Sequence, residues 1–187
     1  MQNASDYFAE NNYEQAAVEY SKVIEMSPDD QSALTAYTFR GYSYFDLGKY
    51  ELAIPDFVKA IELHSTSIGV QQQLGISYYQ TGQYDLAIDQ LTGLIDSGPV
   101  TSPFMYDDRG LAYFARGDYQ LAIDDYTKAV TLFSGDALGY FRRADAYLAT
   151  GQTDMAIADL NKTISLANDP SLKEQARNKL TSLDTGN

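Results

Sequence analysis

Arginine and aspartate recur in this chain as pairs of opposite charge, sixteen residues apart. The pairs are Arg40 with Asp56, Arg109 with Asp125, and Arg143 with Asp159. Such residues could form an anion site built from arginine or an internal ion pair, since a buried guanidinium needs a charged partner. At a fourth place both members change together, to Leu74 and Gln90. Because the two members are kept or lost together, we interpret the three pairs as structural ion pairs.

The other reactive side chains form no pattern that supports catalysis or metal binding. His64 is the only histidine and the chain has no cysteine, so the usual ligands of a transition metal are lacking. Adjacent carboxylates such as Asp107 and Asp108 point to different faces of a helix. Glycine-rich phosphate loops and the serine motif of hydrolases are absent as well. We therefore expect no catalysis, no cofactor and no metal, and we keep an enzyme framed on the same elements only as an alternative.

The charge of the chain narrows the classes of partner. With 13 basic and 26 acidic residues among 187, the net charge is −13. Nucleic acid and anionic membrane surfaces both attract clustered lysine and arginine, so we expect neither as a partner. No apolar run approaches the roughly 18 residues of a membrane span, so we expect no membrane insertion. The compartment stays open: the cytoplasm is favoured, and a soluble part of a longer or exported protein is the alternative.

Five segments that must position these residues are near-copies of one another. They read ASDYFAENNYEQAAVEY from Ala4, GYSYFDLGKYELAIPDF from Gly41, GISYYQTGQYDLAIDQL from Gly75, GLAYFARGDYQLAIDDY from Gly110 and ADAYLATGQTDMAIADL from Ala144. Equivalent positions recur every 34 or 35 residues over the last four copies. This pattern resembles the tetratricopeptide repeat, a helix-turn-helix unit. The first copy starts partway along its first helix, as expected of a chain cut from a longer protein.

The resemblance implies an all-α fold, a right-handed α-solenoid of about five helix-turn-helix repeats with a C-terminal capping helix. The expected repeats span about residues 1–32, 33–67, 68–102, 103–136 and 137–168, and the capping helix spans 170–184, in a single array over residues 1–187. Gly48 and its counterparts should end the first helix of each repeat, because glycine readily takes a left-handed conformation. Pro55 should distort the second helix of its repeat, because it removes one backbone hydrogen bond.

In the family that this chain resembles, the first helices of the repeats line a concave groove that receives peptides. The candidates for such a groove lie on these helices, outside the face that packs within each repeat. They are Thr38, Tyr42, Phe45, Gln72, Ile76, Tyr79, Asp107, Leu111, Phe114, Phe141, Asp145 and Leu148. Tyr42 and Leu111 fit burial between neighbouring repeats nearly as well. Phe45, Tyr79 and Phe114 are the better candidates, since a row of exposed aromatic rings usually marks a binding surface.

The groove positions are aromatic and acidic. Well-known members of the family hold a peptide carboxylate there with Lys, Arg and Asn, whereas here only Arg142 is basic and Asp107 and Asp145 are acidic. The sequence therefore predicts a non-catalytic scaffold for protein–protein interaction. It should bind a segment of another protein that is net basic and carries apolar side chains. Self-association through the exposed first repeat, giving a homo-oligomer, is the alternative.

Overall fold

The computed structural model describes residues 3–26, 31–97 and 104–185. Every regular element within these ranges is an α-helix, and none is a β-strand. The helices are α1 (Ala4–Ala9), α2 (Tyr13–Met26), α3 (Gln31–Asp46), α4 (Tyr50–Glu62), α5 (Ile68–Gln80), α6 (Tyr84–Asp96), α7 (Phe104–Arg116), α8 (Tyr119–Leu132), α9 (Ala137–Ala149), α10 (Thr153–Leu166) and α11 (Pro170–Thr185). The predicted all-α fold of helix-turn-helix units is therefore confirmed.

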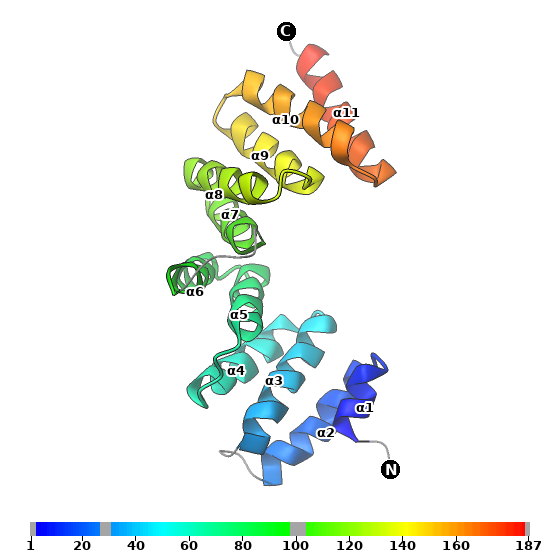
Figure 1. The fold of residues 1–187 in the computed structure, drawn as a ribbon, viewed down its shortest axis with the longest axis vertical. Coiled ribbons are helices and arrows are strands. Elements are labelled where there is room, and N and C mark those ends of the chain that lie inside the picture. Colours follow the sequence, from blue (N-terminus) through cyan, green and yellow to red (C-terminus); the bar gives the residue numbers. More distant parts are fainter. Residues whose placement is uncertain (1–2, 27–30, 98–103, 186–187) are drawn as a thin grey trace. The chain divides into compact units, whose positions relative to one another are not determined.

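These helices group into two compact units, residues Met1–Ser97 and Gly98–Asn187. The first unit holds α1 to α6 as three hairpins, and the second holds α7 to α11 as two hairpins and a last helix (Figure 1). Within each unit, every helix packs against the next one along the chain. Such packing between neighbours is the organisation of repeat proteins. A single array over residues 1–187 stays a prediction.

One residue with a positive φ angle ends the first helix of every hairpin. The set comprises Asn11 (φ 59°), Gly48 (69°), Gly82 (75°), Gly117 (95°) and Gly151 (76°). Glycine takes this left-handed conformation at little cost, and asparagine tolerates it better than most residues. In each case the second helix begins two residues later. The turn chemistry predicted from the sequence is therefore what sets the hairpin boundaries.

Small side chains let the two helices of a hairpin approach closely. The alanine at one repeated position of the second helices is fully buried in every hairpin: Ala16, Ala53, Ala87, Ala122 and Ala156. On the first helices, a Cβ added to Gly41 would lie 2.7 Å from the ring of Phe57. A Cβ added to Gly75 would come equally close to Leu91. These contacts explain why the repeat keeps small residues at the two positions.

Two helices carry features that the sequence singled out. Pro55 lies inside α4, which runs without interruption from Tyr50 to Glu62, so the helix accommodates the proline without ending. At the end of the second unit, α11 buries Ala176 completely and packs Leu172 and Leu180 against the core of that unit. α11 therefore covers the apolar end of the last hairpin, at the position predicted for a capping helix. Among the helices of the described residues, none is both long enough and apolar enough to cross a membrane.

Candidate functional site

The three arginine–aspartate pairs are bidentate ion pairs between the two helices of a hairpin. Nε and Nη2 of Arg40 donate to the two carboxylate oxygens of Asp56 at 2.8 and 2.7 Å. Arg109 contacts Asp125 at 2.7 and 2.8 Å. Nε and Nη2 of Arg143 donate to the carboxylate of Asp159 at 2.7 and 2.8 Å. The aspartates are buried, so each guanidinium satisfies a carboxylate that water does not reach.

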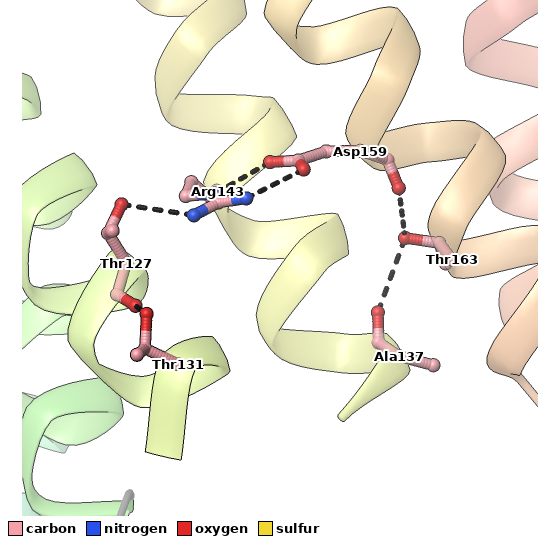
Figure 2. A network of polar contacts seen from close by, with 6 residues as sticks. All are labelled: Thr127, Thr131, Ala137, Arg143, Asp159 and Thr163. Carbon is pink, nitrogen blue, oxygen red and sulfur yellow. Dashed lines mark hydrogen bonds and ion pairs between the residues drawn. The ribbon is translucent and has the colours of Figure 1, made fainter. Parts of the chain in front are cut away.

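Arg40 and Arg143 also reach the preceding hairpin. Nη1 of Arg40 on α3 donates to the hydroxyl of Ser21 on α2 at 2.9 Å. Nη1 of Arg143 on α9 donates to the hydroxyl of Thr127 on α8 at 3.1 Å, so Arg143 joins three helices (Figure 2). Sequence reasoning missed these hydroxyl contacts. The sequence did contain a signal for them. Ser21 and Thr127 occupy the same repeat position, and Val58, which cannot accept a hydrogen bond, occupies it in the hairpin just before the one that has Leu74 in place of arginine.

Each arginine is also held between two tyrosine rings of its own helix. The guanidinium carbon of Arg40 lies 5.6 and 5.9 Å from the ring centres of Tyr37 and Tyr44. The hydrogen bond to Asp56 raises the pKa of Arg40 above its usual value, so the guanidinium stays charged. Burial raises the pKa of Asp56, and Arg40 offsets part of that rise. The charge of each arginine is thus used inside the fold, which argues against an anion site.

In the first unit, the predicted groove residues on α3 and α5 are all half-buried. They are Thr38, Tyr42, Phe45, Gln72, Ile76 and Tyr79. Tyr42 packs its ring edge-on against Phe57, with ring centres 5.4 Å apart. Its hydroxyl also reaches α5, because a Cβ added to Gly69 would lie 3.0 Å from it. Tyr42 therefore contributes to packing between neighbouring hairpins, which was the other reading of this residue.

The aromatic residues expected to be exposed pack instead on the second helix of their own hairpin. Phe45 lies edge-on to Tyr50 with ring centres 5.2 Å apart, and Tyr79 lies 6.0 Å from Tyr84. In the second unit, Phe114 lies 5.2 Å from Tyr119. The rings of Phe45, Tyr79 and Phe114 are all half-buried. One side of each ring is thus supported by the fold, and a fraction of its surface is open to solvent.

Both acidic groove candidates of the second unit already have a cationic partner. Asp107 on α7 is buried and accepts a hydrogen bond from Nη1 of Arg142 on α9. Asp145 on α9 accepts one from Nζ of Lys179 on α11 at 2.5 Å. Lys179 also sits 5.0 Å from the ring centre of Phe141, which is buried. These carboxylates therefore give the face less free negative charge than their residue types predicted.

The remaining candidates of the second unit are apolar and half-buried. Leu111 lies on α7, whereas Phe114 and Leu148 pack against the core of this unit. α7 and α9 therefore carry both apolar candidates and the ion pair between Asp107 and Arg142. The groove assignment itself stays a prediction in both units.

Asp107 has an unusual electrostatic environment. Its Oδ1 atom is buried and makes no hydrogen bond to any residue that the structure describes. Burial raises the pKa of Asp107 from an ordinary 3.8 to about 6. Arg142 lowers this pKa, and the charges of Asp108 and Asp136 raise it further. The pKa of Asp107 thus lies well above that of an ordinary aspartate.

Within the described ranges, no group of three or more His, Cys, Asp and Glu residues is arranged to hold a metal ion. The first unit does contain an open cavity of about 410 Å³ beside the short helix α1. Its apolar wall consists of Tyr20 and Val23 from α2 and Ala36 and Phe39 from α3. This cavity bears on the alternative of self-association.

Family models described as tetratricopeptide repeat match residues 35–67, 73–137 and 108–172. Among solved structures, "Crystal structure of MamA" is 23% identical, with a TM-score of 0.79, and the match covers 95% of this chain and 98% of that one. "MamA 41-end from Desulfovibrio magneticus RS-1" is 19% identical, with a TM-score of 0.80 and coverage of 87% and 90%. "Crystal structure of YrrB: a TPR protein with an unusual peptide-binding site" is 21% identical, with a TM-score of 0.80 and coverage of 94% and 88%. No curated protein matches.

Proposed function

We propose that this chain, which belongs to the tetratricopeptide repeat family, is a non-catalytic scaffold that binds a segment of another protein on the face of its first helices. The observation that carries this proposal is the half-buried ring at the same position of three hairpins: Phe45, Tyr79 and Phe114. A ring held by a neighbouring tyrosine loses little conformational freedom when a ligand covers it, which favours binding. The similar structure of YrrB, described as having a peptide-binding site, agrees with this use of the fold.

The ligand should combine apolar and basic side chains. Apolar groups and cations both bind to aromatic rings, with about 0.5–2 kcal/mol for each contact. The net charge of −13 raises the rate of encounter with a basic segment. Because Asp107 and Asp145 are already paired, the preference for a basic ligand comes from the field of the whole chain. We therefore expect binding to weaken with salt without depending on either aspartate.

The test uses a fluorescent peptide of leucine and lysine, interrupted by proline so that it stays extended. Fluorescence anisotropy would compare the parent protein with a variant carrying Phe45→Ala and Tyr79→Ala. We expect the variant to bind at least about tenfold more weakly, a loss of about 1.4 kcal/mol. Phe133→Ala is the matched control, because this ring is half exposed and lies outside the first helices. Equal affinity of the parent and the double variant would contradict the proposal.

The double variant must be checked for folding before its affinity is interpreted. Phe45 and Tyr79 each pack on a tyrosine of the next helix, and such aromatic pairs contribute about 0.5–1.5 kcal/mol each. The double variant should therefore lose some of its free energy of unfolding, whereas removal of fully exposed rings would leave it unchanged. Binding measured well below the melting temperature, with helicity verified by circular dichroism, separates the two effects.

Self-association is a second candidate, favoured by the cavity beside α1. This first helix spans six residues, whereas the first helices of the other hairpins span 13 or 16. The half-buried Val23 and Phe39 line the open cavity beside this helix. Analytical ultracentrifugation of the parent protein should then show an apparent molecular mass that increases with protein concentration. The charge introduced by Val23→Glu should abolish that increase, and a monomer at all concentrations would eliminate this candidate.

A further inference from the structure

The second helices share an exposed apolar residue that neither the core nor the proposed binding face uses. It is the third residue of four of these helices: Leu52 on α4, Leu86 on α6, Leu121 on α8 and Met155 on α10, spaced 34, 35 and 34 residues apart. Their exposed fractions are 49, 46, 45 and 51%. The alanine that follows each of them is fully buried. We call these four residues the outer apolar set.

Packing within the hairpin does not explain the outer apolar set. A residue whose role is to fill the core is buried, as the neighbouring alanines are, and single exposed apolar residues are normally scattered. Here the same large side chain type returns at one position of four consecutive hairpins, half exposed each time. The first hairpin has Gln15 at this position, which shows that the fold accepts a polar residue there.

Every member of the set has an exposed acidic residue next to it or three residues after it in the sequence. Glu51, Asp85 and Asp154 come directly before three of its members and are exposed. The helix dipole favours acids in a first turn, so these three have a structural explanation. Asp89 and Asp124 follow Leu86 and Leu121 by three residues, and both are exposed. They lie beyond the first turn, where the dipole has no such preference.

We propose that the two members of the outer apolar set in each compact unit form a second docking surface of that unit, and that its partner is an amphipathic segment with lysine or arginine beside large aliphatic side chains. The apolar members would bury the aliphatic groups, and the acidic neighbours would meet the cations. Positive charges lie farther away in the sequence: Lys49 precedes Leu52 by three residues, and Lys59, Lys128 and Lys162 follow Leu52, Leu121 and Met155 by seven. The residues directly before each member, and three residues after it, carry no positive charge. Each compact unit carries two members, so each unit offers both kinds of contact by itself. This surface is separate from the first helices and does not depend on the function proposed for them.

The test is a variant in which all four members become glutamine: Leu52→Gln, Leu86→Gln, Leu121→Gln and Met155→Gln. Glutamine has nearly the helix propensity of leucine and methionine, and it copies the first hairpin. The probe is a fluorescent amphipathic helix of leucine and lysine, about five turns long. A second probe has glutamate in place of lysine. We expect the lysine probe to bind the parent protein and the variant to bind at least about tenfold more weakly, with binding weakened by salt.

Matched controls separate this surface from general stickiness. Ile68→Gln and Leu132→Gln remove apolar side chains that are exposed to a similar degree but lie outside the set, and this control variant should bind the lysine probe like the parent. Phe45→Ala with Tyr79→Ala should leave binding to the outer set in place, so the failure of one proposal is distinguishable from that of the other. Circular dichroism would verify that each variant folds.

Three outcomes would overturn the inference. The first is that the lysine probe does not bind the parent, or that the glutamine variant binds it equally well. The second is that the glutamate probe binds as tightly as the lysine probe. The third is that the parent self-associates and the glutamine variant does not, because a second copy of the chain would then cover the set.

Discussion

The guanidinium of Arg143 holds three consecutive helices of the second unit together. It donates to Asp159 on α10 and to Thr127 on α8 (Figure 2), and Thr163 on α10 bonds to the backbone oxygen of Ala137 on α9. Buried polar contacts of this kind specify one arrangement only when all members are satisfied. The third hairpin lacks the ion pair, with Leu74 and Gln90 at the positions of the arginine and the aspartate. Gln71 replaces the first of the two tyrosines there, and the second is kept as Tyr78. An uncharged version of the same position is therefore also compatible with the fold.

Arg109→Leu should lower the free energy of unfolding by about 3–5 kcal/mol, because it leaves the buried carboxylate of Asp125 without its partner. The double variant Arg109→Leu with Asp125→Gln copies the third hairpin and should recover much of this loss. Urea unfolding of the three proteins measures both effects. A single variant as stable as the parent would show that the pair contributes nothing to the fold.

Asp107 should make the stability of the second unit depend on pH. Its pKa is about 6 in the folded protein and near 3.8 in the unfolded chain, so the folded state binds more protons between these values. The stability that this group contributes is therefore complete below pH 4 and is lost as the pH rises through 6. The difference is on the order of 1–3 kcal/mol.

The control for this effect is Asp107→Asn, which keeps an oxygen acceptor for Arg142 and removes the titration. Denaturant unfolding of both proteins at several pH values between 4 and 7.5 gives two curves of stability against pH. The parent curve should fall more steeply than that of the variant. Parallel curves would mean that Asp107 titrates alike in the folded and unfolded chains.

At the scale of elements, the room for a larger residue on the first helix depends on which side chain faces the glycine. Gly110 faces the rigid ring of Tyr126, 2.7 Å from an added Cβ, and Gly75 faces the flexible side chain of Leu91. Gly110→Ala should therefore cost about 1–3 kcal/mol through overpacking. Gly75→Ala should cost less, because the fifth hairpin already pairs Ala144 with a leucine at the equivalent position.

Thermal unfolding ranks these glycine variants directly. Gly93→Ala is the matched control, because a Cβ there meets no atom within 4 Å. That change should stabilise α6 by about 0.5–1 kcal/mol, the usual difference between alanine and glycine inside a helix. The prediction fails if Gly75→Ala proves more damaging than Gly110→Ala.

Pro55 limits the stability of α4, which continues through it. Pro55→Ala should restore one backbone hydrogen bond at an exposed position and raise the free energy of unfolding by about 1–3 kcal/mol. Pro170→Ala provides the comparison, because proline is well accommodated at the first position of a helix such as α11. Melting temperatures that move equally for both variants would show that Pro55 carries no special cost.

For the whole molecule, repulsion among carboxylates opposes folding. The chain has twice as many acidic as basic residues, and at least nine of the 13 basic side chains already form ion pairs with carboxylates of the same chain. Added salt screens the remaining repulsion at the surface and affects buried pairs less. Moderate salt should therefore raise the melting temperature by about 2–4 °C, equivalent to roughly 1 kcal/mol. A lower melting temperature in salt would show that surface ion pairs outweigh the repulsion.

The sequence alone determined the features that repeat within one hairpin. The glycine turns, the buried alanines and the pairing of Arg40 with Asp56 all follow from spacings shorter than one repeat, where helix geometry dictates which side chains meet. These features were predictable because the same short pattern returns several times and each copy supports the others. The cap at α11 occurs only once, and it was predictable because its apolar residues follow helical spacing.

Only the tertiary structure decided what happens between hairpins and at the surface. Asp107 meets Arg142 and Asp145 meets Lys179 across about one repeat, a distance at which sequence spacing no longer limits which side chains come together. The half-burial of Phe45 likewise depends on how its ring settles on Tyr50 of the next helix. Leu52 and its counterparts looked like ordinary helix residues until their exposure was known. In each case the outcome depends on the packing of separate helices, because burial is a property of the assembled surface and not of a residue type.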